Sequence, residues 1–171
     1  MDVSKAIKQK RAVRKFSSDS LSDLEKRKIL NAGRRSQSSK NSQAWRFMAI
    51  DDAKILNSLS KCGTFAGHLA GASLGIAILT PEPSKRFTIL FDAGQAAAYM
   101  QLAAWELGIG SCLASIYKHE RARDILGFPK NWHLRVAISF GYPKKSNVLD
   151  ASPKKGGRKT LDEVTYWNRW K

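Results

Sequence analysis

The segment from Asp92 to Leu107 constrains the fold more than any other part of the chain. It is rich in Ala, Leu, Met and Gln, which favour an α-helix. Gly108 and Gly110 follow it and act as stop signals. Apolar residues occupy nearly its whole circumference, so no side of this helix is suited to water. The sequence therefore predicts a helix that lies in the core or in an interface between two chains.

Shorter patterns before and after this segment predict helices and strands in an irregular order. Capping boxes at Ser22 and Glu25, and at Thr160 and Glu163, predict one helix that runs to about Arg34 and another, short helix near the C-terminus. Further helices are expected after Asp51 or Asp52 and over 120–126, and strands over 47–50, 74–79, 111–115 and 134–140. Because these elements do not alternate as regular βαβ units, we expect an α+β fold in a single domain, 1–171.

The positive charge of the chain is its second unusual property. Lys and Arg number 30 against 14 Asp and Glu, for a formal charge of +16. Such a balance attracts polyanions, anionic surfaces or phosphorylated ligands, although a solvated lysine-rich surface is an equally good explanation. The cations cluster in KQKRAVRKF (8–16), where Ala12 would let a phosphate approach the backbone. Arg158 lies just before the helix start at Thr160, and helix starts favour anions.

Candidate catalytic side chains do not form a recognisable motif. None of His68, His119 and His133 is paired in sequence with a nucleophile or a second ligand. Cys62 and Cys112 lack metal-ligand and CxxC spacing, and we expect Cys112 to be a buried structural thiol. P-loop, HExxH and GxSxG motifs are absent from the sequence. If the protein is an enzyme, we expect no catalytic side chain and no metal site, with the chemistry carried by a bound cofactor.

Composition also bears on the compartment. The sequence has no apolar run of the roughly 18 residues that a membrane span needs, and its first residues lack the apolar stretch of a signal peptide. The two cysteines need no oxidising environment. We expect a cytoplasmic protein without a membrane partner.

Several segments resemble, in order and spacing, the motifs of the FMN-dependent nitroreductase family. KRAVRKF (10–16) is similar to the family's basic motif Arg-Arg-Ser-x-Arg-x-Phe, and SQSSKNSQAWRF (36–47) to its motif Ala-Pro-Ser-x-x-Asn-x-Gln-Pro-Trp-x-Phe. The long segment 91–112 resembles the family's central dimer helix and the strand that follows it. Later landmarks are LGFP (126–129), the strand and GYP over 136–143, and GRK (157–159). The resemblance covers nearly the whole chain.

This resemblance implies a nitroreductase-like fold, with a mainly antiparallel central sheet flanked by helices, in a domain-intertwined homodimer. Two FMN molecules would lie at the subunit interface. The implied cofactor-binding residues from one chain are Lys10, Arg11, Ala12 and Arg158 around the phosphate and ribityl chain, Arg14 nearer the ring, and Ala114, Ser115 and Ile116 at the flavin edge, where a backbone N–H can bond N5. The partner chain would supply Ser38, Ser39, Asn41 and Gln43.

The sequence also departs from the family pattern. Lys10 replaces a forked Arg, and Ala12 replaces a Ser hydroxyl. Gln37 and Ala44 stand where the family has prolines. The segment 80–91 is short, whereas larger members carry a helical excursion there that shapes the substrate pocket. The sequence therefore supports FMN binding more strongly than any particular substrate.

The function that follows is an FMN-dependent oxidoreductase. NADH or NADPH would deliver a hydride, and a flat electron-poor acceptor such as a nitroaromatic or a quinone would then be reduced in a ping-pong scheme. The alternative is a basic nucleic-acid-binding module without redox activity, which five tryptophans and the charge of +16 make conceivable. Trp45, Trp105 and Trp132 lie in or beside apolar segments, however, so we expect them in the core and disfavour nucleic acid as a partner.

Overall fold

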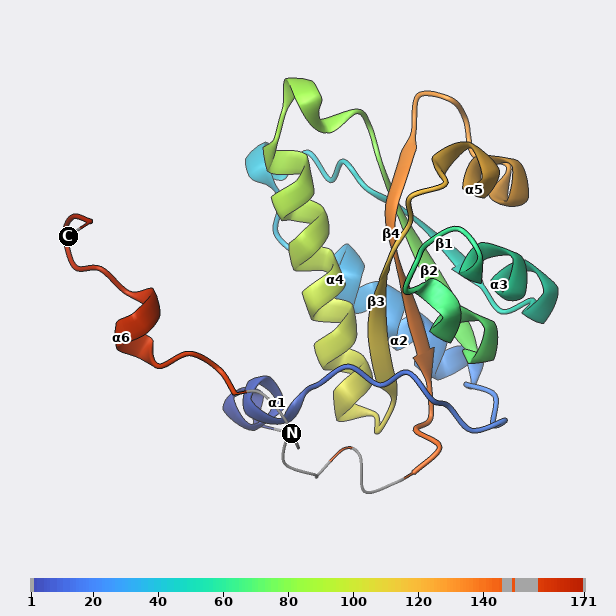
Figure 1. Cartoon of the computed structure of the whole chain (residues 1–171), viewed down its shortest axis with the longest axis horizontal. Coiled ribbons are helices and arrows are strands. Elements are labelled where there is room, and N and C mark those ends of the chain that lie inside the picture. Colours follow the sequence, from blue (N-terminus) through green and yellow to red (C-terminus); the bar gives the residue numbers. More distant parts are fainter. Residues whose placement is uncertain (1, 146–148, 150–156, 171) are drawn as a thin grey trace.

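A computed structural model describes residues 2–145, 149 and 157–170 of the protein (Figure 1). The helices and strands follow in the order α1 (Val3–Gln9), α2 (Asp23–Arg34), β1 (Arg46–Ile50), α3 (Ala53–Ser60), β2 (Leu74–Thr80), α4 (Thr88–Glu106), β3 (Gly110–Ser115), α5 (His119–Leu126), β4 (His133–Gly141) and α6 (Leu161–Val164). Short 3₁₀ helices lie between them, namely η1 (Ser39–Asn41), η2 (Ala66–Gly71) and η3 (Pro83–Lys85).

The strands form one four-stranded sheet in the order β1-β2-β4-β3, and every neighbouring pair is antiparallel. All seven residues of β2 are buried, as expected for a central strand covered on both faces. β1 and β3 form the two edges of the sheet. The antiparallel pairing confirms the predicted α+β fold and places β3 where one side of its backbone is open.

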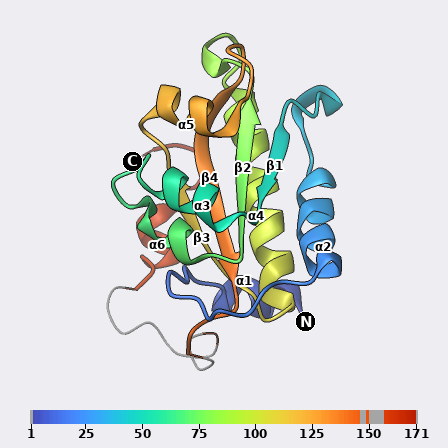
Figure 2. The same ribbon diagram turned by 90° about the vertical axis from the view of Figure 1, so that its right-hand side faces the viewer.

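Helices cover both faces of the sheet (Figures 1 and 2). One face packs against α3, η2 and α5, through a core that includes Leu56, Leu69 and Phe128. The other packs against α2 and α4, through a core that includes Ile29 and Met100. The tryptophans expected in the core are largely buried: Trp45 belongs to the second core, Trp105 is buried, and Trp132 packs partly buried against the first core.

The predicted capping boxes are confirmed. At the start of α2, the Glu25 N–H donates to Ser22 Oγ, and the Glu25 carboxylate accepts the Ser22 N–H at 2.8 Å. Thr160 and Glu163 repeat the arrangement at α6. Asp52, one of the two residues expected to cap the next helix, accepts N–H groups at the start of α3. Local hydrogen-bonding signals therefore predicted these helix starts.

Helix α4 is longer than predicted, because it begins at Thr88 and runs for 19 residues. It buries one side, which includes Met100, against α2 and the sheet. Its other side exposes an apolar surface that includes Leu90, Phe91 and Tyr99. The predicted apolar circumference is thus confirmed, and one half of it has no cover within the described chain.

The C-terminal segment 157–170 extends away from the body of the molecule (Figure 1). Trp167 and Trp170 are 78% and 79% exposed, and the Tyr166 ring stacks on Trp170 with centroids 4.0 Å apart.

In the part of the chain that the structure describes, no helix combines the length and the apolarity that crossing a membrane requires.

Candidate functional site

The basic segment 10–16 crosses the sheet at the beginning of β3. The Val13 N–H donates to the Ser111 carbonyl at 2.9 Å, and Ala12 forms a parallel bridge with Ser111. The Val13 side chain is buried against Gly110, where an added Cβ would lie 2.6 Å from Val13 Cβ. Ala12 and Arg14, on either side of this anchor, are exposed. The segment is therefore held by its backbone and by Val13, which leaves its cations available.

These cations share a hollow with others from the end of the sheet. Residues Ala12 to Lys15 line it together with Lys144 and Lys145, and the Lys144 N–H donates to the Lys15 carbonyl at 3.0 Å. Within 2–145 and 157–170, none of these cations has a carboxylate at ion-pair distance. Burial lowers the pKa of the neighbouring Lys10 ammonium. A concentration of cations without acids favours an anionic ligand over an internal salt-bridge network.

The outer edge of β3 presents unpaired backbone groups. The Ile116 N–H donates inward to the Arg135 carbonyl at 2.9 Å, whereas the Ser111 carbonyl accepts from Val13 on the outer side. Hydrogen bonding alternates along an antiparallel strand, so Leu113 and Ser115 also point their backbone groups outward. Ser115 N–H has no acceptor among the described residues. Of the three residues predicted at the flavin edge, only Ser115 thus offers a free N–H.

The Ser115 carbonyl is closed off by the loop before η2. An added Cβ at Gly63 would lie 2.0 Å from this oxygen, so only glycine allows so close an approach. The carbonyl of Cys62 in the same loop accepts N–H groups from Tyr117 and Lys118. The side chains of Ala114 and Ile116 are buried in the core. These contacts hold the end of β3 in place and leave the Ser115 N–H as its open group.

His68 is a buried histidine near the β3 edge that no sequence pattern singled out. Its Nδ1 lies 2.7 Å from Ser139 Oγ, and Ser139 Oγ donates to the Cys112 carbonyl at 3.4 Å. Burial lowers the pKa of the imidazole and outweighs the opposing effect of the Leu113 backbone, and the nearby charge of Arg14 lowers the pKa further. The fold therefore places a buried, neutral histidine close to Arg14 and to the backbone of Leu113.

Cys112 is the structural thiol that the sequence predicted. It is 4% exposed, and burial raises its pKa, so the protonated thiol persists at neutral pH. Its Sγ faces the Leu113 carbonyl at 3.5 Å. The described residues include no group of three or more His, Cys, Asp and Glu side chains that could hold a metal ion.

An apolar pocket of about 450 Å³ lies on the α4 side of the same edge. Leu113 projects into it from β3, opposite Leu90, Gly94 and Ala97 of α4. Among the described residues, Arg135 from β4 is the one charged residue of its lining. The β3 edge thus lies between a cationic region that includes Arg14 and an apolar region on α4.

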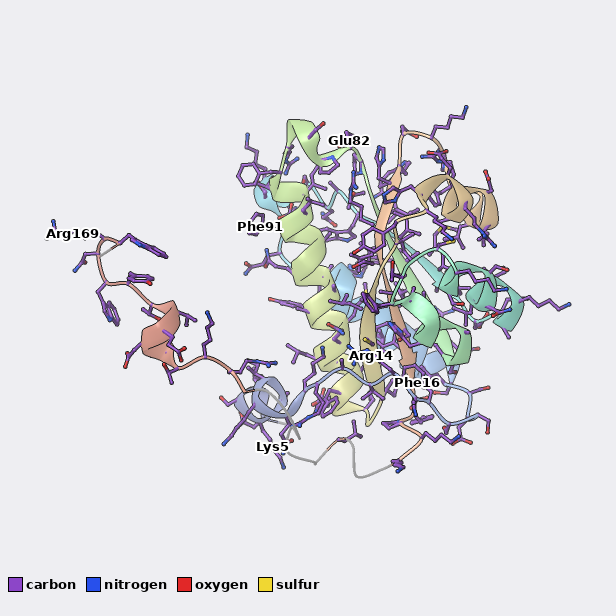
Figure 3. The ribbon with its side chains drawn as sticks, in the orientation of Figure 1. Lys5, Arg14, Phe16, Glu82, Phe91 and Arg169 are labelled. Atoms are coloured by element: carbon purple, nitrogen blue, oxygen red, sulfur yellow. The ribbon has the colours of Figure 1, made fainter. Side chains whose placement is uncertain are left out.

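The loop over 38–43, which the resemblance predicts to act from the partner chain, lies at the start of α4. The Ser39 N–H donates to both carboxylate oxygens of the buried Asp92, at 3.0 and 3.1 Å. α4 has 19 residues and is therefore about 28 Å long, and segment 10–16 lies near its far end (Figures 1 and 3). The structure therefore does not bring Ser38, Ser39, Asn41 and Gln43 together with Arg14 within one chain.

The loop itself has a compact and unusual backbone. Lys40, Asn41 and Gln43 have φ values of 55°, 51° and 46°, in the left-handed region. Ser38 Oγ accepts the Gln43 N–H at 3.0 Å, and Gln43 Nε2 donates to Asn41 Oδ1 at 3.2 Å. These bonds hold the loop in a compact conformation.

Arg158 is the one predicted residue outside the folded body. It is exposed at the start of the C-terminal segment, and no hydrogen bond or ion pair in the described structure joins it to segment 10–16. Its role in binding the phosphate therefore stays a prediction.

The chain matches known proteins over most of its length. The family model described as "Nitroreductase family" matches residues 7–66 and 60–142. The chain belongs to the nitroreductase family. A protein of Archaeoglobus fulgidus, provisionally named NADH dehydrogenase/NAD(P)H nitroreductase, is 32% identical over 147 residues, which cover 82% of the chain and 84% of that relative. This nitroreductase-family chain is therefore an oxidoreductase.

Solved structures support the same fold. An FMN-dependent nitroreductase from Clostridium difficile R20291 superposes with a TM-score of 0.84 at 28% identity, over 98% of this chain and 100% of that one. The NfrA2 protein of B. megaterium superposes with a TM-score of 0.89, over 100% of this chain and 76% of that one. At 16% identity, this similarity supports the fold and no statement about function.

Proposed function

We propose that this nitroreductase-family protein binds FMN along the open edge of β3, accepts a hydride from NADH or NADPH, and reduces a flat, electron-poor acceptor in a ping-pong scheme. The observation that carries the proposal is that open edge, with the free N–H of Ser115, cations at one end and an apolar pocket on one side. A flavin is complementary to these three features: it has a ring nitrogen that accepts a hydrogen bond, an anionic phosphate and an apolar dimethylbenzene ring.

The phosphate end of the cofactor would be held by Lys10, Arg11, Ala12 and Arg158. The exposed Ala12 leaves the backbone approachable, and the cations beside it have no described acid to neutralise them. Arg11 Nε donates to the Gln9 carbonyl at 2.9 Å, which limits the positions that its guanidinium can take. Charge-assisted hydrogen bonds to a phosphate are stronger than neutral ones, so this end would supply much of the affinity.

The ring end would lie beside Ser115 and Arg14. The Ser115 N–H would donate to N5, between Ala114 and Ile116, whose buried side chains hold the strand. Arg14 would stabilise negative charge that develops on the ring. When bound, FMN would supply the hydride chemistry, because it can take two electrons from the nicotinamide and pass them on to the acceptor. The protein would bind, orient and shield it.

The site would be completed by a second copy of the chain. The loop with Ser38, Ser39, Asn41 and Gln43 lies at the start of α4, whereas segment 10–16 lies near the end of that helix (Figure 1). An apolar surface on α4 and the projecting C-terminal segment both lack cover within the described chain. Exposed apolar patches of this kind mark protein–protein contacts. A domain-intertwined homodimer would cover them and bring the loop to the partner's β3 edge.

Flavin titration tests this proposal. Purified protein, stripped of any bound flavin, is titrated with FMN while flavin fluorescence and sedimentation are followed. The proposal predicts saturable binding of one FMN per chain in a dimer. A protein that binds no flavin, or a monomer that binds it fully, contradicts the proposal.

A further inference from the structure

A buried polar cluster lies beside β3, where η2 packs against the sheet. His68 of η2 is 9% exposed, and its Nδ1 lies 2.7 Å from Oγ of the buried Ser139 on β4. Ser139 Oγ donates to the Cys112 carbonyl on β3 at 3.4 Å. Because the hydroxyl proton points to Cys112, this oxygen accepts a hydrogen bond from Nδ1–H of His68. The imidazole is therefore fixed through a protonated Nδ1, and a second proton would go to Nε2.

The titratable groups around this imidazole are cations and a thiol. Burial lowers the pKa of His68, the Leu113 backbone opposes this effect, and the charge of Arg14 lowers the pKa further. Arg14 and Lys10 also act on the neighbouring Cys112 thiol. Within the described chain, no carboxylate forms an ion pair with His68. His68 is therefore neutral at pH 7, in a position that the charge of Arg14 reaches.

We propose that His68 takes up a proton when the flavin ring beside Arg14 is reduced and releases it when the ring is reoxidised. This inference rests on the proposed function, in which Arg14 faces the ring. Arg14 disfavours a charged His68 because like charges repel, so a negative charge placed against Arg14 has the opposite effect. His68 is thus a positioning residue for a proton, which acts through the charge at Arg14.

The cluster can hold this proton without losing a hydrogen bond. When Nε2 is protonated, Nδ1–H still donates to Ser139 Oγ, and Ser139 still donates to the Cys112 carbonyl. The Leu113 backbone favours the charged imidazole. Burial and the charge of Arg14 oppose it, and a negative charge on the ring offsets the second of these.

The step balances in atoms and in charge. NADH or NADPH gives a hydride to the ring and leaves as NAD⁺ or NADP⁺, so the ring gains one negative charge. His68 takes one proton from the solvent and gains one positive charge. A quinone such as menadione, a methylnaphthoquinone, then removes the hydride and takes one proton from the solvent to become a hydroquinone. His68 returns its own proton to the solvent as the charge on the ring disappears.

Histidine NMR tests the proton uptake directly in the wild-type protein. The chain has three histidines, and the variants His119→Gln and His133→Gln assign two of the resonances, which leaves that of His68. The pH titration is followed with oxidised FMN bound and, without oxygen, with FMN reduced by dithionite. We expect the pKa of His68 to be higher with reduced FMN, and the other two titration curves to stay where they are.

The midpoint potential of bound FMN gives a second readout. Between the two pKa values of His68, reduction consumes two protons instead of one, so its equilibrium constant falls about 100-fold per pH unit instead of about tenfold. We expect the steeper fall in the wild type and the shallower one in His68→Gln. The control is His119→Gln, which replaces a less buried histidine on α5 and should keep the wild-type slope.

The coupling to Arg14 is tested without the cofactor. In flavin-free protein, Arg14→Gln should raise the pKa of His68, because the variant removes a like charge. Arg121→Gln removes an exposed cation from α5 and should leave the pKa of His68 unchanged.

Three results would overturn the inference. An equal pKa of His68 with oxidised and reduced FMN removes the proton uptake, and a wild-type slope in His68→Gln assigns the extra proton to another group. Equal effects of Arg14→Gln and Arg121→Gln remove the coupling. If His68→Gln does not fold, the wild-type titration still decides. Wild-type protein that binds no FMN is a separate result, because it removes the proposed function and this inference with it.

Discussion

At the scale of single residues, Arg14 is the cation whose role is most sharply defined. It is exposed beside Cys112 and His68, at the end of the open β3 edge. We expect Arg14→Ala to weaken FMN roughly ten- to 150-fold, the effect of losing a charge-assisted bond of about 1.5–3 kcal/mol, without unfolding the protein. Fluorescence titration measures it, with Arg121→Ala on α5 as the control. Equal FMN affinity in both variants would remove Arg14 from the site.

His68 predicts a pH dependence of folding stability. Burial lowers its pKa in the folded protein, so the unfolded chain binds more protons below the ordinary pKa of about 6.5. The contribution to stability is complete above that pH and is lost as the pH falls toward the folded pKa. Urea unfolding at several pH values should show this loss, and His68→Gln should flatten it. A variant that keeps the full wild-type slope would show that His68 is not its source, with His119→Gln as the control.

Sequence patterns can single out individual residues only where the signal is local. The segment 10–16 could be singled out by its cations, and the structure groups those residues at one edge. The choice of Ser115 over its neighbours depends on strand register, which no single residue encodes. His68 was missed because its partner Ser139 is 71 positions away.

At the scale of elements, helix starts followed from capping residues and strand positions from apolar runs. Helix α1 has neither a capping box nor a continuous apolar face, and the residue pattern did not predict it. The earlier start of α4 depends on tertiary contacts of Arg86 and Asp92 with the loop at Ser39. The pairing order β1-β2-β4-β3 arises from packing between distant segments, which local patterns do not specify.

The capping box of α2 gives a prediction at this scale. Ser22→Ala removes the acceptor for the Glu25 N–H and should lower the free energy of unfolding by about 1 kcal/mol. Urea denaturation measures the change, with the exposed Ser20→Ala as the control. Equal unfolding midpoints for the two variants would show that the cap contributes nothing to stability.

At the scale of the whole molecule, the exposed side of α4 predicts how the chain assembles. Tyr99 is 40% exposed on that side, whereas Gln101 is buried and donates to Ser111 Oγ at 3.2 Å. We expect Tyr99→Glu to dissociate the dimer, because it places a charge in an apolar contact. Sedimentation at micromolar concentration measures this. Gln101→Glu should lower folding stability instead, and a wild-type monomer would refute the interface.

In the complete molecule that we propose, two chains hold FMN so that electrons enter from a nicotinamide and leave to a planar acceptor. Its most direct test is an anaerobic titration of the FMN-loaded dimer followed by visible absorbance. We predict that one equivalent of NADH or NADPH per flavin bleaches the oxidised spectrum, and that one equivalent of menadione then restores it. Bound flavin that neither nucleotide reduces, or reduced flavin that menadione does not reoxidise, would contradict the claim.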